Sequence, residues 1–141
     1  MRIRLAIAAG AFLATGCGSI QQRVDPVAKG EEKSICLQPN VAARETFLST
    51  YQKTLEQKGF TVVVVPEQGS TAGCRLVSNY SARWGWSGVT MSMTYADIRI
   101  IRDGVLAGRA TYDATRSRGF DKVIVAEDKI VELVDKLFPY R

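Results

Sequence analysis

The stretch CRLVSNYSARWGWSGVTMSMTYADIRIIRDGVLAGRATYDA, residues 74–114, decides the fold of this chain. It contains three long extended runs, at 74–86, 89–101 and 105–114, which are separated by the turn sequences Ser87-Gly88 and Asp103-Gly104. Extended runs joined by such short turns are typical of β-hairpins. We therefore expect an antiparallel three-stranded meander.

A strand, a helix and a second strand are expected before this meander. Residues 34–37 form a short apolar run, residues 40–58 carry apolar side chains at helical spacing, and residues 61–65 contain unbroken valines typical of a buried strand. Strand, helix, strand is the pattern of a parallel crossover unit. A last helix is expected after the meander, capped by Asp121 and ended by Pro139.

The register of the second turn predicts which side chains face the core. A three-residue loop that pairs 101 with 105 sets Ile98 and Ile100 on one side, with Leu106 facing Ile100. The opposite side then carries Asp97 across from Arg109, as an exposed ion pair worth a few tenths of a kcal/mol, roughly. A two-residue turn is rejected, because it would mix Arg109 with Ile98.

The first 16 residues have the pattern of a secretory leader. Arg2 and Arg4 precede an apolar run at 5–13, and small residues follow. The string Leu-Ala-Thr-Gly-Cys at 13–17 resembles the lipobox of bacterial lipoproteins. In those proteins the cysteine takes a diacylglycerol, the leader is cleaved and the new terminus receives an acyl chain such as palmitate.

The resemblance implies that Cys17 carries acyl chains and anchors the mature chain to a membrane. The alternative is an uncleaved anchor helix, but the apolar run has about half of the ~20 residues that cross a bilayer. Gly18 and Ser19 follow the cysteine, and neither is the aspartate associated with inner-membrane retention in enterobacterial lipoproteins. The expected location is the periplasmic face of the outer membrane.

Three regions are expected: a signal peptide at 1–16, the lipidated cysteine with a flexible tether at 17–31, and a periplasmic α/β domain at 32–141. The tether is poor in apolar residues and contains Pro26 and Gly30. Cleavage leaves 141 − 16 = 125 residues, enough for one domain. It also lowers the net charge from +5 to 17 − 14 = +3, which gives no reason to expect a nucleic-acid partner.

Cys36 and Cys74 are expected to form a disulfide, because paired thiols oxidise outside the cytoplasm. The bridge would close a loop of 74 − 36 + 1 = 39 residues and contribute about 3–4 kcal/mol. Two buried thiols are the alternative.

The bridge forms easily if the first and third strands are antiparallel neighbours. We therefore predict an α+β domain of order βαβββα, with a mixed five-stranded sheet of order 2-1-3-4-5 and both helices on one face.

Aromatic and sulfur-containing side chains gather along the first hairpin of the meander. Two readings of them remain open. In the first, which we favour, a bulge near Thr94 reverses the side of the sheet that the following side chains face, and these side chains join the core. In the second, they form an apolar platform on the sheet face that no helix covers. As a platform near the tether, they and the neighbouring arginines would suit a lipid headgroup surface or an anionic glycolipid. The possible binding surface consists of Arg83, Trp84, Trp86, Met91, Met93, Arg116 and Arg118, and its arginines can equally be solvated turn charges.

No catalytic motif stands out in the sequence. The chain has no histidine, no Gly-x-Ser-x-Gly elbow and no cysteines spaced as a ligand pair, so we predict no enzyme, no cofactor and no metal. We expect a binding or accessory module of the cell envelope, with an unknown envelope protein or lipid as partner. The alternative is a small hydrolase or transferase that works without histidine. Asp97, Asp113 and Asp121 are the carboxylates placed where such a site could form.

The order of these features resembles a family of small proteobacterial lipoproteins, the Sbal-type lipoproteins. The resemblance rests on the lipobox, the two cysteines, and aromatic and small residues on the helix and the meander. It implies a membrane-attached periplasmic domain and assigns no molecular role. One departure is Ser87, where an acidic residue is expected after the second tryptophan. The matching residues include Phe47, Tyr51, Tyr80, Trp84, Trp86, Tyr95, Gly108 and Tyr112.

Overall fold

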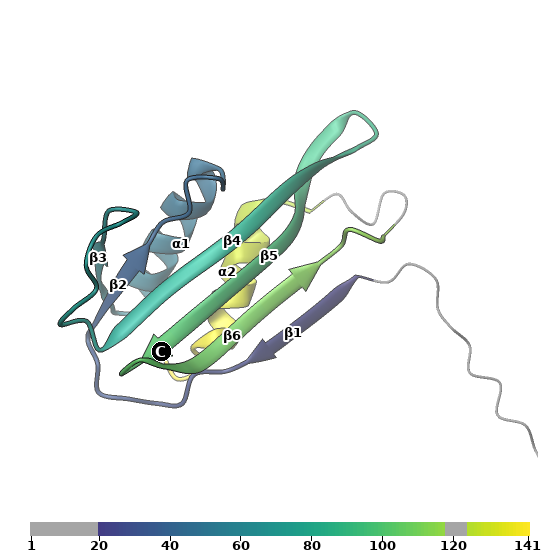
Figure 1. Ribbon diagram of the computed structural model, residues 1–141. Helices are drawn as coiled ribbons and strands as arrows, with labels where there is room; N and C mark the ends of the chain where they lie inside the picture. Colours follow the sequence, from purple (N-terminus) through teal and green to yellow (C-terminus); the bar gives the residue numbers. More distant parts are fainter. Residues whose placement is uncertain (1–19, 118–123) are drawn as a thin grey trace, which may run out of the picture.

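The computed structural model describes residues 20–117 and 124–141, and Figure 1 shows its arrangement. The predicted leader, Cys17, Arg118 and Asp121 lie outside the described residues. The elements follow in the order β1 (Gln21–Asp25), β2 (Ser34–Gln38), α1 (Glu45–Gln57), β3 (Thr61–Val64), β4 (Leu76–Ser87), β5 (Thr90–Arg102), β6 (Val105–Asp113) and α2 (Ala126–Leu137). The predicted α+β class is confirmed.

The sheet has six strands in the order β1-β6-β5-β4-β2-β3, so the predicted count of five is wrong. The additional strand is β1, whose residues were expected to belong to a flexible tether. It pairs antiparallel with β6 from Gln21↔Asp113 to Asp25↔Arg109, and Val27 just after it is only 3% exposed. The folded domain therefore starts about ten residues earlier than predicted.

Strands β2, β3 and β4 run parallel to one another. The expectation that the first strand of the crossover unit runs antiparallel to the meander's first strand is therefore wrong. The loop between β3 and β4 returns the chain to the end of the sheet where β2 begins. Strand β4 therefore runs parallel to β2. Cys74 lies just before β4, and its disulfide with Cys36 is present, with Cα atoms 6.0 Å apart.

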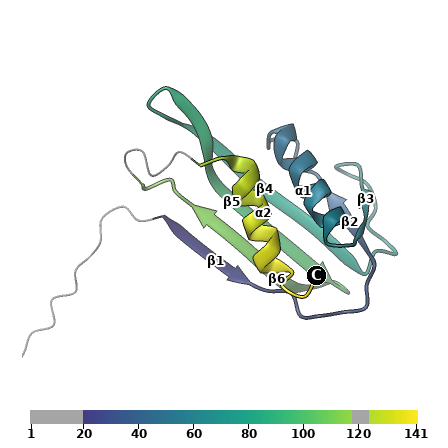
Figure 2. The same cartoon turned by 180° about the vertical axis from the view of Figure 1, so that it is seen from behind.

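Both helices cover one face of the sheet: they lie behind it in Figure 1 and in front of it in Figure 2. Phe47 and Tyr51 of α1 pack on Tyr80 of β4, with the Phe47 and Tyr80 rings stacked at 4.4 Å. Helix α1 begins later than the predicted residue 40, because the Asn40 Oδ1 accepts a hydrogen bond from the Ala42 N–H and closes a turn. The helix-covered face holds the main core. No described helix covers the opposite face, which we call the uncovered face, although Cys36, Val65 and Val77 form a separate, smaller buried cluster.

The β5–β6 connection differs from the predicted loop. Asp103 and Gly104 both have positive φ, 50° and 81°, which makes a two-residue turn that pairs Arg102 with Val105. A register shift between Ile100 and Ile101 then returns Ile98 and Ile100 to the predicted side of the sheet. Ile98 and Ile100 are fully buried as expected, whereas Leu106 is 56% exposed and not part of the core.

Candidate functional site

The β4–β5 hairpin projects beyond the rest of the sheet (Figure 1). Strand β6 ends at Asp113, opposite Tyr95, while β4 and β5 continue to pair with each other up to Ser87↔Thr90. The predicted bulge near Thr94 is confirmed, because Arg83 pairs with Tyr95 and the next residue pairs with Met93. The same end of the sheet holds the start of β1 and the end of β6.

The bulge divides the aromatic set between core and surface. Tyr80 and Met93 are buried, as the favoured reading predicted, and Trp84 packs half-buried against the core. Trp86 is 68% exposed and Val89 is 94% exposed, so burial is wrong for the hairpin tip. The tip therefore presents an indole and an aliphatic side chain to the surroundings, and we call residues 86–89 the hairpin tip.

Arg44 also belongs to this surface, although it was not among the predicted binding residues. Its guanidinium lies 5.7 Å from the centre of the Trp84 ring and contacts the Met91 sulfur. These three side chains line a hollow of about 260 Å³, together with Val125 before α2. Arg44 precedes α1 in the chain and reaches the hairpin only through the tertiary fold, so no local pattern identified it.

Of the predicted arginines, Arg83 and Arg116 lie at the same end but on other surfaces. The Arg83 guanidinium lies 4.4 Å from the centre of the Tyr95 ring, on the sheet face without helices, and Arg116 is exposed after β6. Hydrogen bonds from Thr115, helped by the charges of Arg83 and Arg116, hold the pKa of Asp113 below its usual value. The hairpin end thus combines exposed apolar side chains with cations.

On the uncovered face, Asp97 is held between two arginines. Arg109 donates to both carboxylate oxygens, at 2.8 and 2.9 Å, and Arg99 donates at 3.0 Å. The predicted ion pair is present, although Thr111 and not Arg109 lies directly opposite Asp97, and the carboxylate is only 5% exposed and not solvated. Burial raises the pKa of Asp97, yet the hydrogen bonds from Arg109 and Arg99 outweigh it, and the pKa lies below its usual value.

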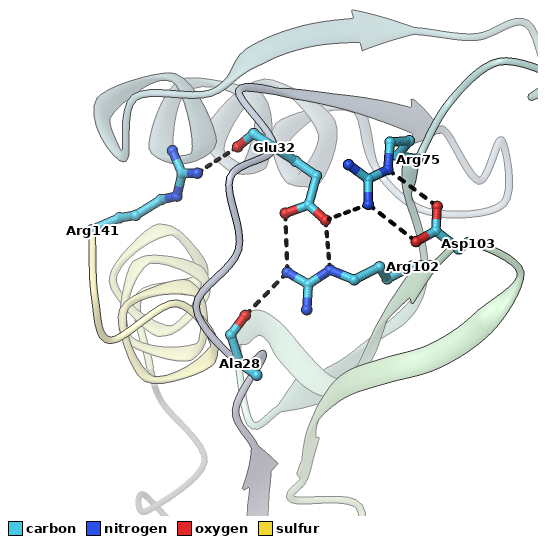
Figure 3. Close-up of polar contacts among 6 residues, drawn as sticks. All are labelled: Ala28, Glu32, Arg75, Arg102, Asp103 and Arg141. Atoms are coloured by element: carbon cyan, nitrogen blue, oxygen red, sulfur yellow. Dashed lines mark hydrogen bonds and ion pairs between the residues drawn. The ribbon is translucent and has the colours of Figure 1, made fainter.

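A second cluster lies at the other end of the sheet (Figure 3). Glu32, in the β1–β2 connection, accepts hydrogen bonds from Arg102 Nε and Nη2 at 2.7 and 3.2 Å, and its side chain is 6% exposed. Arg75 lies 3.9 Å from the same carboxylate and pairs with Asp103. Burial raises the pKa of Glu32, but its own backbone N–H and Arg102 outweigh this effect and lower the pKa. A cavity of about 250 Å³ opens beside the cluster.

The class of protein that these observations define is a one-sheet α+β domain with a projecting hairpin and two charged clusters. Within the described residues, no helix is long and apolar enough to cross a membrane, and no group of three or more acidic or cysteine side chains could hold a metal ion.

No family model matches the chain, and no curated protein matches it. Among solved structures it is similar to PelC from Paraburkholderia phytofirmans, crystallised as a dodecamer. The identity is 19% and the TM-score is 0.57, over 86% of this chain and 99% of that one. A point variant of that dodecamer, in another crystal form, matches at 20% identity with a TM-score of 0.56 over the same shares of both chains. At this identity the similarity establishes the fold alone.

Proposed function

We propose that this chain is a lipid-anchored lipoprotein on the periplasmic face of the outer membrane and serves as a non-catalytic assembly module. The observation that carries the proposal is the position of β1. It begins at Gln21, four residues after Cys17, at the end of the sheet where the hairpin projects. Four residues span at most about 14 Å, so acyl chains on Cys17 would hold this end of the domain close to the lipid.

The chemistry of the hairpin end supports this orientation. Trp86 is 68% exposed and Val89 is 94% exposed. Tryptophan is favoured at the boundary between lipid and water, where its ring meets the acyl region and its N–H stays solvated. Arg83 and Arg116 at the same end would face acidic headgroups. The hairpin tip is therefore proposed as a second, non-covalent membrane contact.

Copies of the same chain are the proposed protein partner. The similar PelC structures are dodecamers. The outer strands of this sheet are β1 and β3, and β3 exposes Val63 (48%) and Val64 (41%). An apolar strand edge is a template for pairing with another chain, and two different edges allow the head-to-tail contact that closes a ring.

The alternative function, a small hydrolase or transferase, needs a carboxyl group with a raised pKa in a pocket. The pKa values of Asp97 and Asp113 are instead lowered, by arginine and threonine hydrogen bonds respectively. Asp121 lies outside the described residues. The described residues therefore provide no group that favours this alternative.

The anchor is tested by intact-mass spectrometry of the full-length gene product purified from bacterial membranes. We expect a chain that begins at Cys17 and carries the mass of the acyl groups, and a soluble unprocessed chain from Cys17→Ser. A wild-type chain with intact residues 1–16 and no added mass contradicts the proposal. Gly18→Asp tests sorting, because it should move the lipoprotein to the inner membrane if the enterobacterial rule applies.

Orientation and assembly need separate measurements. A photoreactive phenylalanine analogue at Trp86 should crosslink to phospholipid, whereas the analogue at Val131 on α2 is the matched surface control. A crosslink from the hairpin tip to a second copy would contradict the membrane contact.

Mass photometry in nanodiscs should show a homo-oligomer that Val63→Lys weakens and Val131→Lys leaves intact. A monomer at micromolar concentration would contradict self-assembly.

A further inference from the structure

The cavity beside Glu32 lies at the end of the sheet opposite the hairpin tip. Its lining includes Arg102, the last residue of β5, whereas the tip precedes Thr90, the first residue of that strand. Twelve steps of about 3.3 Å separate these two ends of β5, about 40 Å in all. The cavity is thus a separate place from the proposed membrane contact, and neither that contact nor self-assembly uses it.

The floor of the cavity is apolar. Val27, Phe60, Leu76 and Phe138 line it, and each of them is at most 5% exposed. They come from four separate segments, which meet here without filling the space between them. A volume of about 250 Å³ corresponds to about eight waters at their share of liquid volume. The floor therefore offers a small apolar surface, which an apolar group in the cavity would cover.

The rim of the cavity is cationic. The side chains of Lys29, Arg102 and Arg141 line it together with that of Glu32, so the side-chain charge of the lining is 3 − 1 = +2. The Arg141 guanidinium lies 4.1 Å from the centre of the Phe60 ring and donates to the backbone oxygen of Glu32. That position keeps a positive charge at the mouth, beside the apolar floor.

Arg102 is fixed in place but not fully used. Its Nε donates to Glu32, and its Nη2 donates to Glu32 and to the Ala28 oxygen at 3.0 Å. Guanidinium has five N–H donors, so the two on Nη1 have no hydrogen-bond partner among the described residues. Figure 3 shows this third nitrogen on the side of the guanidinium away from Glu32, with no dashed line to it.

Gly30 makes this arrangement possible. A Cβ at position 30 would overlap the Glu32 carboxylate and lie 2.5 Å from Arg102 Nη2. The β1–β2 connection therefore passes over the guanidinium at a distance that a side chain would prevent. A preorganised guanidinium beside an apolar floor is suited to a carboxylate, because the free Nη1 can donate a charge-assisted hydrogen bond to one of its oxygens.

We infer that this cavity binds a small monocarboxylate with an apolar chain, of about eight non-hydrogen atoms in all. The carboxylate accepts hydrogen bonds at the rim from Arg102 and Arg141, and the chain lies on Val27, Phe60 and Phe138. Two sources have this chemistry: a free short acyl acid, and the carboxyl end of a peptide whose last residue is apolar. The inference is independent of the lipid anchor.

The test is saturation-transfer NMR with hexanoate, which has eight non-hydrogen atoms. The full-length protein is used in nanodiscs, or in solution if it carries no lipid, and empty discs are the blank. We expect binding with a Kd on the order of 1 mM, as a ligand of this size allows. Hexanol and hexylamine should bind at least five-fold more weakly, because neither carries an anion. N-Acetylvaline distinguishes the sources: tighter binding than hexanoate indicates a peptide end, and weaker binding indicates a free acid.

Variants assign the binding to the cavity. Lys29→Gln combined with Arg141→Gln should weaken hexanoate at least five-fold, while Lys33→Gln, on the same connection but outside the lining, should not. Far-UV circular dichroism confirms that each variant is folded. The inference is overturned if hexanoate gives no transfer up to 20-fold above that Kd, if hexylamine binds equally, or if a folded double variant binds hexanoate as the wild type does.

Discussion

Replacing Arg102 by methionine should destabilise the protein strongly at neutral pH. The change keeps the aliphatic stem and removes the guanidinium from a Glu32 carboxylate that is 6% exposed. Removing one partner of a buried ion pair costs about 3–5 kcal/mol, because the other charge stays buried and unpaired. The arginine is 23% exposed and Arg75 lies 3.9 Å from the carboxylate. We therefore expect the lower end of that range, about 3 kcal/mol.

The pH dependence separates this mechanism from a simple loss of packing. In the wild type the pKa of Glu32 is lowered, so its contribution is present above the ordinary value of 4.5 and is lost as the pH falls through the folded value. In Arg102→Met the contributions of Arg102 are lost, while burial, the backbone hydrogen bond of Glu32 and the charge of Arg75 remain, so the pKa of Glu32 is higher than in the wild type. The difference in stability between the two proteins should therefore narrow as the pH falls from 7 to 4.

Urea unfolding followed by far-UV circular dichroism, at pH 7 and at pH 4, measures the loss of unfolding free energy and its dependence on pH. Arg75→Met is the matched control: its guanidinium is 66% exposed, and we expect little change. The double variant Glu32→Gln with Arg102→Met should be more stable at pH 7 than Arg102→Met, because no buried charge remains. The reasoning is refuted if Arg102→Met loses the same free energy at both pH values, or if the double variant is no better.

Three further outcomes are expected. Reducing the Cys36–Cys74 disulfide should lower the free energy of unfolding by about 3–4 kcal/mol, seen as a lower urea midpoint with dithiothreitol; an unchanged midpoint would show that the bridge adds nothing. Trp86→Ala should change stability by less than about 0.5 kcal/mol, whereas Trp84→Ala should cost about 2 kcal/mol in thermal unfolding, because only Trp84 packs on the core; equal losses would place both tryptophans in one environment. Hydrogen bonds from a glutamine on β1 and two lysines on α2 lower the pKa of Glu132 from 4.5 to about 2. The contribution of Glu132 to stability is therefore present above pH 4.5 and is lost as the pH falls towards 2. Glu132→Gln should flatten the plot of stability against pH in that window, and a plot parallel to that of the wild type would count against these bonds.

The meander was predictable because its signals are local. Alternation of side chains and two turn sequences mark β4, β5 and β6, and the bulge near Thr94 that the aromatic pattern favoured is present. The rejection of a two-residue turn at Asp103 was wrong. A second register shift, after Ile100, compensates for the reversal of side-chain direction that this turn alone would cause. One bulge could be inferred from a pattern; two compensating irregularities could not.

The remaining features depend on distant partners. Strand β1 contains one apolar residue, Val24, because it lies at the edge of the sheet and forms few core contacts of its own. Its place is fixed by β6 and by hydrogen bonds such as that from Gln22 to Glu132 at 2.9 Å. The Glu32–Arg102 pair joins residues 70 positions apart, so neither member is marked in its own segment.

The pairing of the first strand with the last has a consequence for the timing of folding. Gln21 and Asp113 are partners, although they lie 113 − 21 = 92 positions apart in the sequence. A chain exported from its amino end would deliver β1 long before β6, and contacts of such separation form late. The segment next to Cys17 would therefore stay unpaired while the rest of the domain crossed the membrane. If Cys17 is lipidated as proposed, this delay would leave the cysteine accessible to the processing enzymes, and the sheet would close after attachment to the lipid.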